Sequence, residues 1–392
     1  MKKVICLFLV LMLAFGAIAC SADTTATAAP AASEETGSSD ASSAVAETAA
    51  PAEVKEPVHL VYGAPSTATS VSIWYALQQG YFEDYGVDLE MIFFNSGTSI
   101  NDAARAGEID LYSLGCMMAT TGATTFGSKL VAYLAPDNAA YRVYARNDSP
   151  VIQAGQGHIA AYPDVYGDAE SWENSTVLLT KGQSGHYTIS AILELLGITC
   201  NDITYIDMEQ NQIPVVFSSG EGDVMVAGNP NWAEFAADPD HYTLVASLDM
   251  LYPDYDNIAT IMACKDALEN KTEGLYGFVK ALTKAQIELE ADSDLFHEWM
   301  YKWQQEYNVS ATQESATFDC GFYKLPTLDF LDEYYGGGAD SIVCGVFSKI
   351  AKFMSENDQM SADTYANYQA INYIAPEFTL KAVEDLRAEG YK

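Results

Sequence analysis

The sequence predicts an α/β protein with two similar lobes, each built on a mainly parallel sheet flanked by helices. Two observations carry this prediction. Short β-branched or aromatic runs alternate with amphipathic helical stretches, the pattern of strand–helix–strand units with parallel strands and right-handed crossovers. The same order of elements occurs twice, once from His59 and again from Thr176. The 392 residues are 49% hydrophobic, enough for the cores of about two domains.

The first copy begins with a strand, and a small-residue loop leads from it into a helix over Val71–Gln79. Apolar residues recur on one face of this helix, and a glycine follows its end. A strand over Val87–Phe94 and a helix over Ile100–Ala106 come next. The turn Gly107–Asp110 then leads into a strand that closes at Gly115.

The second copy has a strand, a helix that ends at Gly197, a strand over Asp202–Met208 and a helix over Gln212–Ser218. The turn Gly220–Asp223 leads into a strand that closes at Gly228. The glycine, glutamate, aspartate and closing glycine of this segment repeat those of the first copy at the same spacing. The shared order of elements therefore indicates two lobes of one plan.

The chain after about Ile258 is mainly helical, with two amphipathic stripes that return it to the first lobe. We expect lobe 1 to comprise residues 58–143 and 255–392, and lobe 2 to comprise residues 144–254. Tyr334 and Tyr335 precede three glycines, which predicts a mobile surface loop.

Four loops at the carboxyl ends of predicted strands are candidates for a binding site. In open α/β sheets, ligands bind where strands end and loops enter helices. Most of these loops are rich in glycine and hydroxyl residues, and backbone N–H groups at helix starts favour anionic or strongly polar ligand groups. The loops are Ala64–Thr69, Asn95–Ser99, Lys181–His186 and Gly228–Trp232.

The amino terminus predicts export. Lys2 and Lys3 precede an apolar run over Val4–Ile18 that is too short for a comfortable membrane span, which is typical of a secretory signal peptide. The run ends at Cys20 in a segment that resembles a bacterial lipobox. We expect a signal peptide over residues 1–19, lipidation of Cys20, a flexible tether over residues 20–57, and an extracytoplasmic protein held at the bacterial cell membrane by acyl chains only. An ordinary secretory peptide with a chance cysteine is the alternative.

Charge and cysteine content exclude several classes of function. The chain has 54 acidic against 19 basic residues and a formal net charge of −35, which excludes a nucleic-acid binder working through a basic surface. No C-x-x-C pair occurs, so no zinc knuckle is supported, and we expect neither a metal nor a cofactor. Five further cysteines are read as small buried residues, with a Cys320–Cys344 disulfide left open.

Four segments carry a resemblance to a known family: Gly80–Ser99, Gly107–Gly115, Lys129–Val151 and Trp172–Trp232. They resemble the nitrate/sulfonate/taurine-type substrate-binding proteins of ABC importers, a group that includes thiamine-precursor binders. The resemblance implies a bilobal periplasmic-binding-protein fold of type II with two crossovers. It also implies a monomer that captures a small-molecule solute between its lobes and delivers it to an ABC permease and its ATPase.

The resemblance places ligand contacts in the four loops and at one strand end: Ser66, Thr67, Ser96, Gly97, Thr98, Ser113, Gln183, Ser184, Gly185, His186, Asn229 and Trp232. Ser96 and Ser184 fit equally as helix N-caps. His186 also fits as a solvent-facing residue at a helix start, and Trp232 as a core residue. Whether the solute is an anion or a flat neutral heterocycle is left open.

Two other functions fit parts of the sequence. A surface sensor or adhesion lipoprotein could reuse the same fold. The run Gly182–His186 follows a strand and opens a helix, as the nucleophile elbow of a serine esterase would, but His186 stands where that elbow needs glycine. We therefore expect no enzymatic activity.

Overall fold

The computed structural model describes residues 56–65, 67–94, 96–229, 231–307 and 311–392. The chain divides into two units, residues 1–53 and residues 54–392, and every described residue belongs to the second. The predicted signal peptide, Cys20 and almost all of the predicted tether lie outside the described residues, as does Ser66.

The first sheet has the strand order β2–β1–β3–β10–β4. Strand β1 is parallel to β2 and β3, while β10 is antiparallel to both β3 and β4. Four strands therefore point the same way and one is reversed. The strands are β1 (Val58–Pro65), β2 (Val87–Phe94), β3 (Leu111–Gly115), β4 (Lys129–Pro136) and β10 (Ile258–Ala263).

The second sheet repeats this plan with the order β7–β6–β8–β5–β9. Strands β6, β7 and β8 are parallel, and β5 runs antiparallel to β8 and β9. Each sheet thus contains one strand that runs against its two neighbours, β10 in the first sheet and β5 in the second. The prediction of mainly parallel sheets is confirmed. The strands are β5 (Tyr141–Arg146), β6 (Thr176–Leu179), β7 (Thr204–Asp207), β8 (Val224–Gly228) and β9 (Tyr242–Ser247).

The chain passes between the sheets after β4 and again after β9. The boundary expected between residues 143 and 144 falls inside β5, all of which pairs within the second sheet. The division into lobes otherwise stays a prediction.

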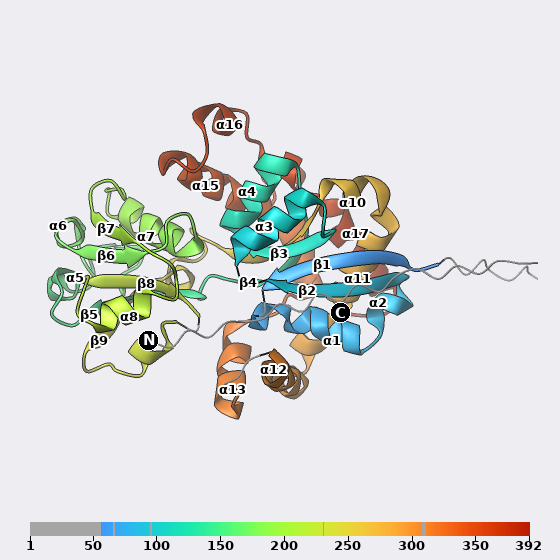
Figure 1. Cartoon of the computed structure of the whole chain (residues 1–392), viewed down its shortest axis with the longest axis horizontal. Helices are drawn as coiled ribbons and strands as arrows, with labels where there is room; N and C mark the ends of the chain where they lie inside the picture. Colours follow the sequence, from blue (N-terminus) through green and yellow to red (C-terminus); the bar gives the residue numbers. More distant parts are fainter. Residues whose placement is uncertain (1–55, 66, 95, 230, 308–310) are drawn as a thin grey trace, which may run out of the picture. The chain divides into compact units, whose positions relative to one another are not determined.

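Helices flank both sheets (Figure 1). Those of the first sheet include α1 (Val71–Gln78), α2 (Tyr81–Asp84), α3 (Gly97–Ala106), α4 (Cys116–Phe126), α10 (Lys265–Asn270), α11 (Thr272–Ala291), α14 (Leu328–Tyr335), α15 (Ile342–Glu356) and α17 (Pro376–Ala388). Those of the second are α5 (Pro150–Ala154), α6 (Ala169–Glu173), α7 (Ser184–Leu195), α8 (Ile213–Ser218) and α9 (Ala233–Ala236). The last third of the chain adds α12 (Ser293–Tyr307), α13 (Gln313–Phe322) and α16 (Ala362–Ala366). Short 3-10 helices are η1 (Ala68–Ser70), η2 (Leu248–Leu251), η3 (Gly338–Asp340) and η4 (Ala370–Tyr373).

The repeated aspartates perform the same structural task in both sheets. Asp110 Oδ2 accepts the backbone N–H of Val61 at 2.9 Å, and Asp223 Oδ2 accepts that of Thr176 at 2.8 Å. Each carboxylate also pairs with a lysine or an arginine. The repeated turn therefore ties the last strand of each unit to its first strand. The same spacing occurs in both copies because the aspartate has the same role in holding each sheet together.

Local expectations about two helix starts and one tyrosine pair are corrected. Helix α7 begins at Ser184 and helix α3 at Gly97. Both helices were expected to begin about three residues later, because the serines and glycines at these positions have low intrinsic helix propensity. Tyr334 and Tyr335 are buried rather than on a surface loop, since their rings pack on the core side of α14. The described cysteines agree with the interpretation as small buried residues: all five are free, four are buried, and Cys320 is partly buried and not paired with Cys344.

Within the described part of the chain, no helix combines the length and the apolar character needed to cross a membrane. The same residues contain no group of three or more histidine, cysteine, aspartate or glutamate side chains placed to hold a metal ion.

Candidate functional site

A cleft of about 1230 Å³ lies where the loops at the carboxyl ends of the strands meet. Loops that follow β1, β2, β3, β6 and β8 all contribute to its wall, together with the crossover after β4 and part of α12 and α13. The convergence of these loops is what the order of elements predicted. The cleft is somewhat larger than the roughly 300–1,000 Å³ of typical small-molecule pockets.

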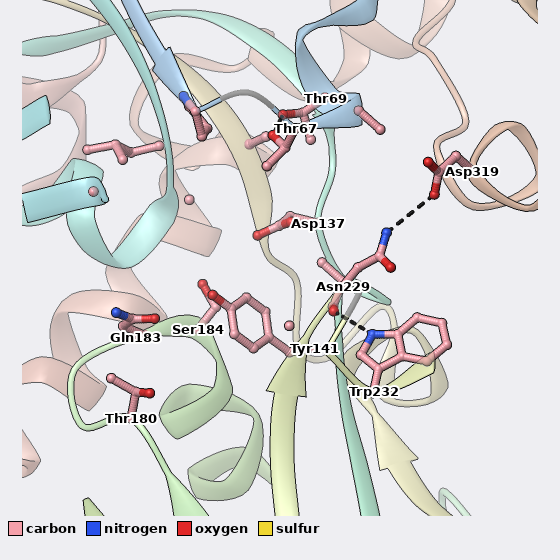
Figure 2. A pocket seen from close by; sticks show the side chains of 18 of the residues that line it. Thr67, Thr69, Asp137, Tyr141, Thr180, Gln183, Ser184, Asn229, Trp232 and Asp319 are labelled. Carbon is pink, nitrogen blue, oxygen red and sulfur yellow. Dashed lines mark hydrogen bonds between the residues drawn. The ribbon is translucent and has the colours of Figure 1, made fainter. Parts of the chain in front are cut away.

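Nine of the expected contact residues line this cleft, several of which are labelled in Figure 2: Thr67, Ser96, Gly97, Thr98, Ser113, Gln183, Ser184, Asn229 and Trp232. Gly185 and His186 do not line it. Whether the nine residues contact a solute stays a prediction.

The two serines at helix starts have different roles. Ser96 is the N-cap of α3, and its Oγ accepts the N–H of Ser99 at 3.1 Å. Ser184 is the first residue of α7 rather than its cap, which is Gln183. The Ser184 hydroxyl is therefore not used for capping, and it lies 3.2 Å from the point where a Cβ on Gly115 would stand.

Gly115 permits a close approach across the cleft. It is the N-cap of α4, and its φ of −65° suits any residue. A Cβ at this position would meet Ser184 Oγ at 3.2 Å and Asp137 Oδ2 at 3.3 Å. The missing side chain thus leaves room at the point where the loop after β3, the crossover after β4 and the start of α7 come together.

His186 faces the protein interior. It is 1% exposed, its Nδ1 accepts the N–H of Gly182 at 3.3 Å, and its ring centroid lies 5.0 Å from that of Phe353. Burial lowers its pKa to about 4. Because α7 starts earlier than expected, residue 186 points away from the cleft. This histidine therefore braces α7 against α15 and does not act as a base for Ser184.

Gly185 makes room for an aromatic ring that the sequence did not single out. A Cβ on Gly185 would meet Tyr141 Cδ1 at 3.0 Å, and one on Gly228 would meet Tyr141 Cε1 at 3.2 Å. The Tyr141 ring therefore lies close against both glycines and forms part of the cleft wall. Gly185 therefore affects the cleft indirectly, by leaving space for the Tyr141 ring in its wall.

Trp232 is almost entirely enclosed at the edge of the cleft. Its side chain is 1% exposed, and its Nε1 donates to the backbone oxygen of Ala140 at 3.1 Å. The guanidinium carbon of Arg142 lies 4.3 Å from its ring centroid, and the Phe318 ring lies 5.4 Å away. The side chain thus joins the loop after β8 to the crossover and to α13.

Asp137 lies in the middle of the cleft and was missed by sequence reasoning. Figure 2 shows its carboxylate between Thr67 and Thr69 on one side and Tyr141 and Ser184 on the other. Its Oδ2 accepts the amide of Asn257 at 2.8 Å. Burial raises its pKa from 3.8 to about 7. The sequence signal that could have pointed to Asp137 as a site residue is its position directly after an apolar strand.

Asp319 brings helix α13 to the cleft. Its two oxygens accept Asn229 Nδ2 at 3.3 Å and Gln304 Nε2 at 2.7 Å, and burial raises its pKa. The first of these bonds links the loop after β8 to α13 (Figure 2). No local sequence feature relates α13 to that loop, because they lie 90 residues apart.

We predict that Asp137→Asn makes the protein more stable at pH 8. A carboxyl with a raised pKa binds its proton in the folded state up to about pH 7, whereas the unfolded chain releases it near pH 4. Its contribution to stability is therefore present at low pH and is lost as pH rises through 7. The asparagine variant does not titrate and can still accept from Asn257.

The measurement is Tm as a function of pH for both proteins. The advantage of the variant over the native protein should grow between about pH 4 and pH 7 and then level off. Parallel curves over this range would contradict the assigned titration.

Comparison with known proteins identifies related sequences. The model of the family described as NMT1/THI5 like matches residues 68–292, more than half of the 392 residues. A protein of Brachyspira hyodysenteriae named as an ABC transporter periplasmic binding protein is 25% identical over 250 residues, which are 63% of this chain and 70% of that protein.

Two solved structures share the fold at low identity. The alkanesulfonate-binding protein SsuA of Xanthomonas axonopodis pv. citri, bound to MOPS, superimposes with a TM-score of 0.60 at 14% identity, covering 82% of this chain and 99% of its own. The nitrate-binding protein NrtA of Synechocystis PCC 6803 gives a TM-score of 0.56 at 16% identity, covering 86% and 91%. The expected bilobal periplasmic-binding-protein fold is thereby confirmed.

Proposed function

The chain belongs to the NMT1/THI5-like family, and on that premise we propose that it is the extracytoplasmic substrate-binding component of an ABC importer. In this proposal a small polar solute enters the cleft and is delivered to a permease driven by an ATPase. The matched relatives are substrate-binding proteins, and the chain is accordingly a binding protein rather than an enzyme.

The observation that carries the proposal is a cleft whose wall comes from the strand ends of both sheets. A solute in such a cleft contacts both sheets at once. It can therefore stabilise one relative arrangement of the two sheets, because a ligand shifts a conformational equilibrium only by its differential affinity for the two states. A permease could recognise that arrangement as the loaded form.

Acyl chains on Cys20 hold the protein at the membrane in this proposal, and residues 20–57 provide the tether. The protein acts as a monomer. Two acyl chains anchor a protein without spanning the bilayer, which leaves the cleft exposed to solutes outside the membrane.

A thermal-shift screen of the full chain tests the proposal. The screen covers sulfonates, pyrimidines, small aromatic acids and small amines. A true solute at 100 times its Kd should stabilise the folded protein by about 2.7 kcal/mol and raise Tm by several degrees. Membrane fractionation of cells that produce the native chain and a Cys20→Ser variant tests the anchor, since only the variant should leave the membrane.

Failure of every solute to raise Tm would overturn solute capture. A solute that binds while no permease co-purifies with the loaded protein would favour the sensor or adhesion function over import.

A further inference from the structure

Among the described residues that line the cleft there is no arginine, although arginine is the side chain best suited to bind sulfonate, nitrate or carboxylate by two parallel hydrogen bonds. The chain has only four arginines. All four pack on an aromatic ring or pair with a carboxylate: Arg105 with Phe126, Arg142 with Trp232, Arg146 with Asp223, and Arg387 with Asp329 and Asp332.

Carboxylates outnumber cations around the cleft. Among the described residues that line it, the acidic ones are Asp137, Asp207, Glu209 and Asp319, and Lys181 is the only lysine or arginine. Lys181 is exposed. The formal charge of the lining is therefore −3, or −2 when Asp137 is protonated. The starts of α3, α4 and α7 add about +0.5 each, about +1.5 together, so the helix ends do not offset the carboxylates.

Asp137 occupies the place where an oxyanion would approach the start of α4. Its Oδ2 lies 3.3 Å from the Cβ position of Gly115, the N-cap of that helix. Asn257 holds this oxygen by its amide, while no described residue donates a hydrogen bond to Oδ1. One oxygen is thus anchored to the protein and the other is available to a donor in the cleft. A second anion placed here would meet like-charge repulsion in a poorly solvated site.

Aromatic rings surround the same space. Tyr141, Trp303, Phe318 and Tyr323 all line the cleft, and the Phe318 side chain is 44% exposed. Ring faces attract cations as well as flat apolar groups, so these side chains suit a ligand that combines a positive group with an aromatic body.

We propose that the cleft selects an organic cation, an amine or amidine whose N–H groups pair with Asp137, and rejects oxyanions such as sulfonates and nitrate. This inference rests on the proposed solute-binding function and names the class of solute. Asp137 provides the specific pair, and the surplus of carboxylates around the cleft sets the sign of charge that can enter.

Isothermal titration of the full chain at pH 8 tests the proposal with probes of matched shape: the cations benzamidine and benzylamine, and the anions benzoate and benzenesulfonate. At least one cation should bind, at least 10-fold more tightly than its anionic counterpart. Asp137→Asn should lower the affinity for that cation by at least 10-fold. Asp102→Asn, which removes the same charge from the exposed side of α3, should change its affinity less than 2-fold.

The outcomes distinguish a failure of the cation inference from a failure of the proposed solute-binding function. If neither cation binds more tightly than the anions, or if Asp137→Asn leaves the affinity of the cation unchanged, the inference is wrong. Solute binding as such survives if an anion or a neutral solute of the wider screen raises Tm, and it fails if nothing does. The folded state of Asp137→Asn is checked by its Tm, which should exceed that of the native protein at pH 8.

Discussion

Replacing Gly115 by valine is expected to lower the affinity of the cleft for its solute by about 10- to 100-fold, since forcing a side chain into a gap this narrow costs about 1–3 kcal/mol. Even the first carbon of the new side chain would stand 3.2 Å from Ser184 Oγ and 3.3 Å from Asp137 Oδ2, and the two γ-methyl groups extend further. The backbone at this position accepts any residue, so the effect should fall on closure and ligand contact rather than on folding.

Titration with whichever solute the screen identifies measures this effect, and Tm without solute reports folding. Gly345→Val on α15 is the matched control, because no atom lies within 4 Å of its Cβ position. It should bind the solute like the native protein. An unchanged affinity in Gly115→Val would mean that the solute does not use the junction of the loop after β3, the crossover after β4 and α7.

Replacing Trp232 by alanine is expected to lower the free energy of unfolding by about 3–5 kcal/mol, the cost of removing a buried tryptophan. The ring is enclosed, its N–H donates to Ala140, and Arg142 stacks on it. Truncation leaves a cavity, removes one of the two hydrogen bonds to the Ala140 oxygen and takes away the nearer of the two rings under the Arg142 guanidinium. The loop after β8 would lose its side-chain link to the crossover and keep only the backbone bond from Asn229 N–H to the Ala140 oxygen.

Denaturant unfolding measures this loss. Phe318→Ala is the control, because the Phe318 ring touches Trp232 but is 44% exposed, and it should cost well under half as much. A Trp232→Ala protein of native stability that no longer binds solute would instead assign the ring to ligand stacking, one of the two interpretations that the sequence left open.

The cleft loops could be predicted from the sequence because each one depends only on the strand before it and the helix after it. A strand that ends in glycine and hydroxyl residues before a helix places those residues at the carboxyl edge of a parallel sheet, whatever the rest of the chain does. Thr67, Ser96 and Ser184 were found in this way, and all three line the cleft. His186 was misplaced because it was expected in the loop before α7, whereas it is the third residue of that helix and its ring packs on Phe353.

Asp137 and Asp319 could not be found by the same reasoning. Asp137 follows the last strand before a crossover, and its environment depends on Asn257, 120 residues away. Asp319 lies on an amphipathic helix in the last third of the chain, and it meets the cleft only because α13 packs beside Trp232 and Asn229. Asp319 has no local pattern that distinguishes it from the many other acidic residues, and the only local signal at Asp137 is its position directly after the apolar strand β4.

The sequence by itself determined the two sheets of one plan, the edge at which their loops gather and the family to which the chain belongs, because alternation, turn chemistry and spacing act within short segments. Only the tertiary structure decided which charges face the cleft. The surplus of acidic residues in the sequence did not specify the sign of charge inside, since a single buried carboxylate such as Asp137 dominates its surroundings, where less water screens it, more than many exposed ones.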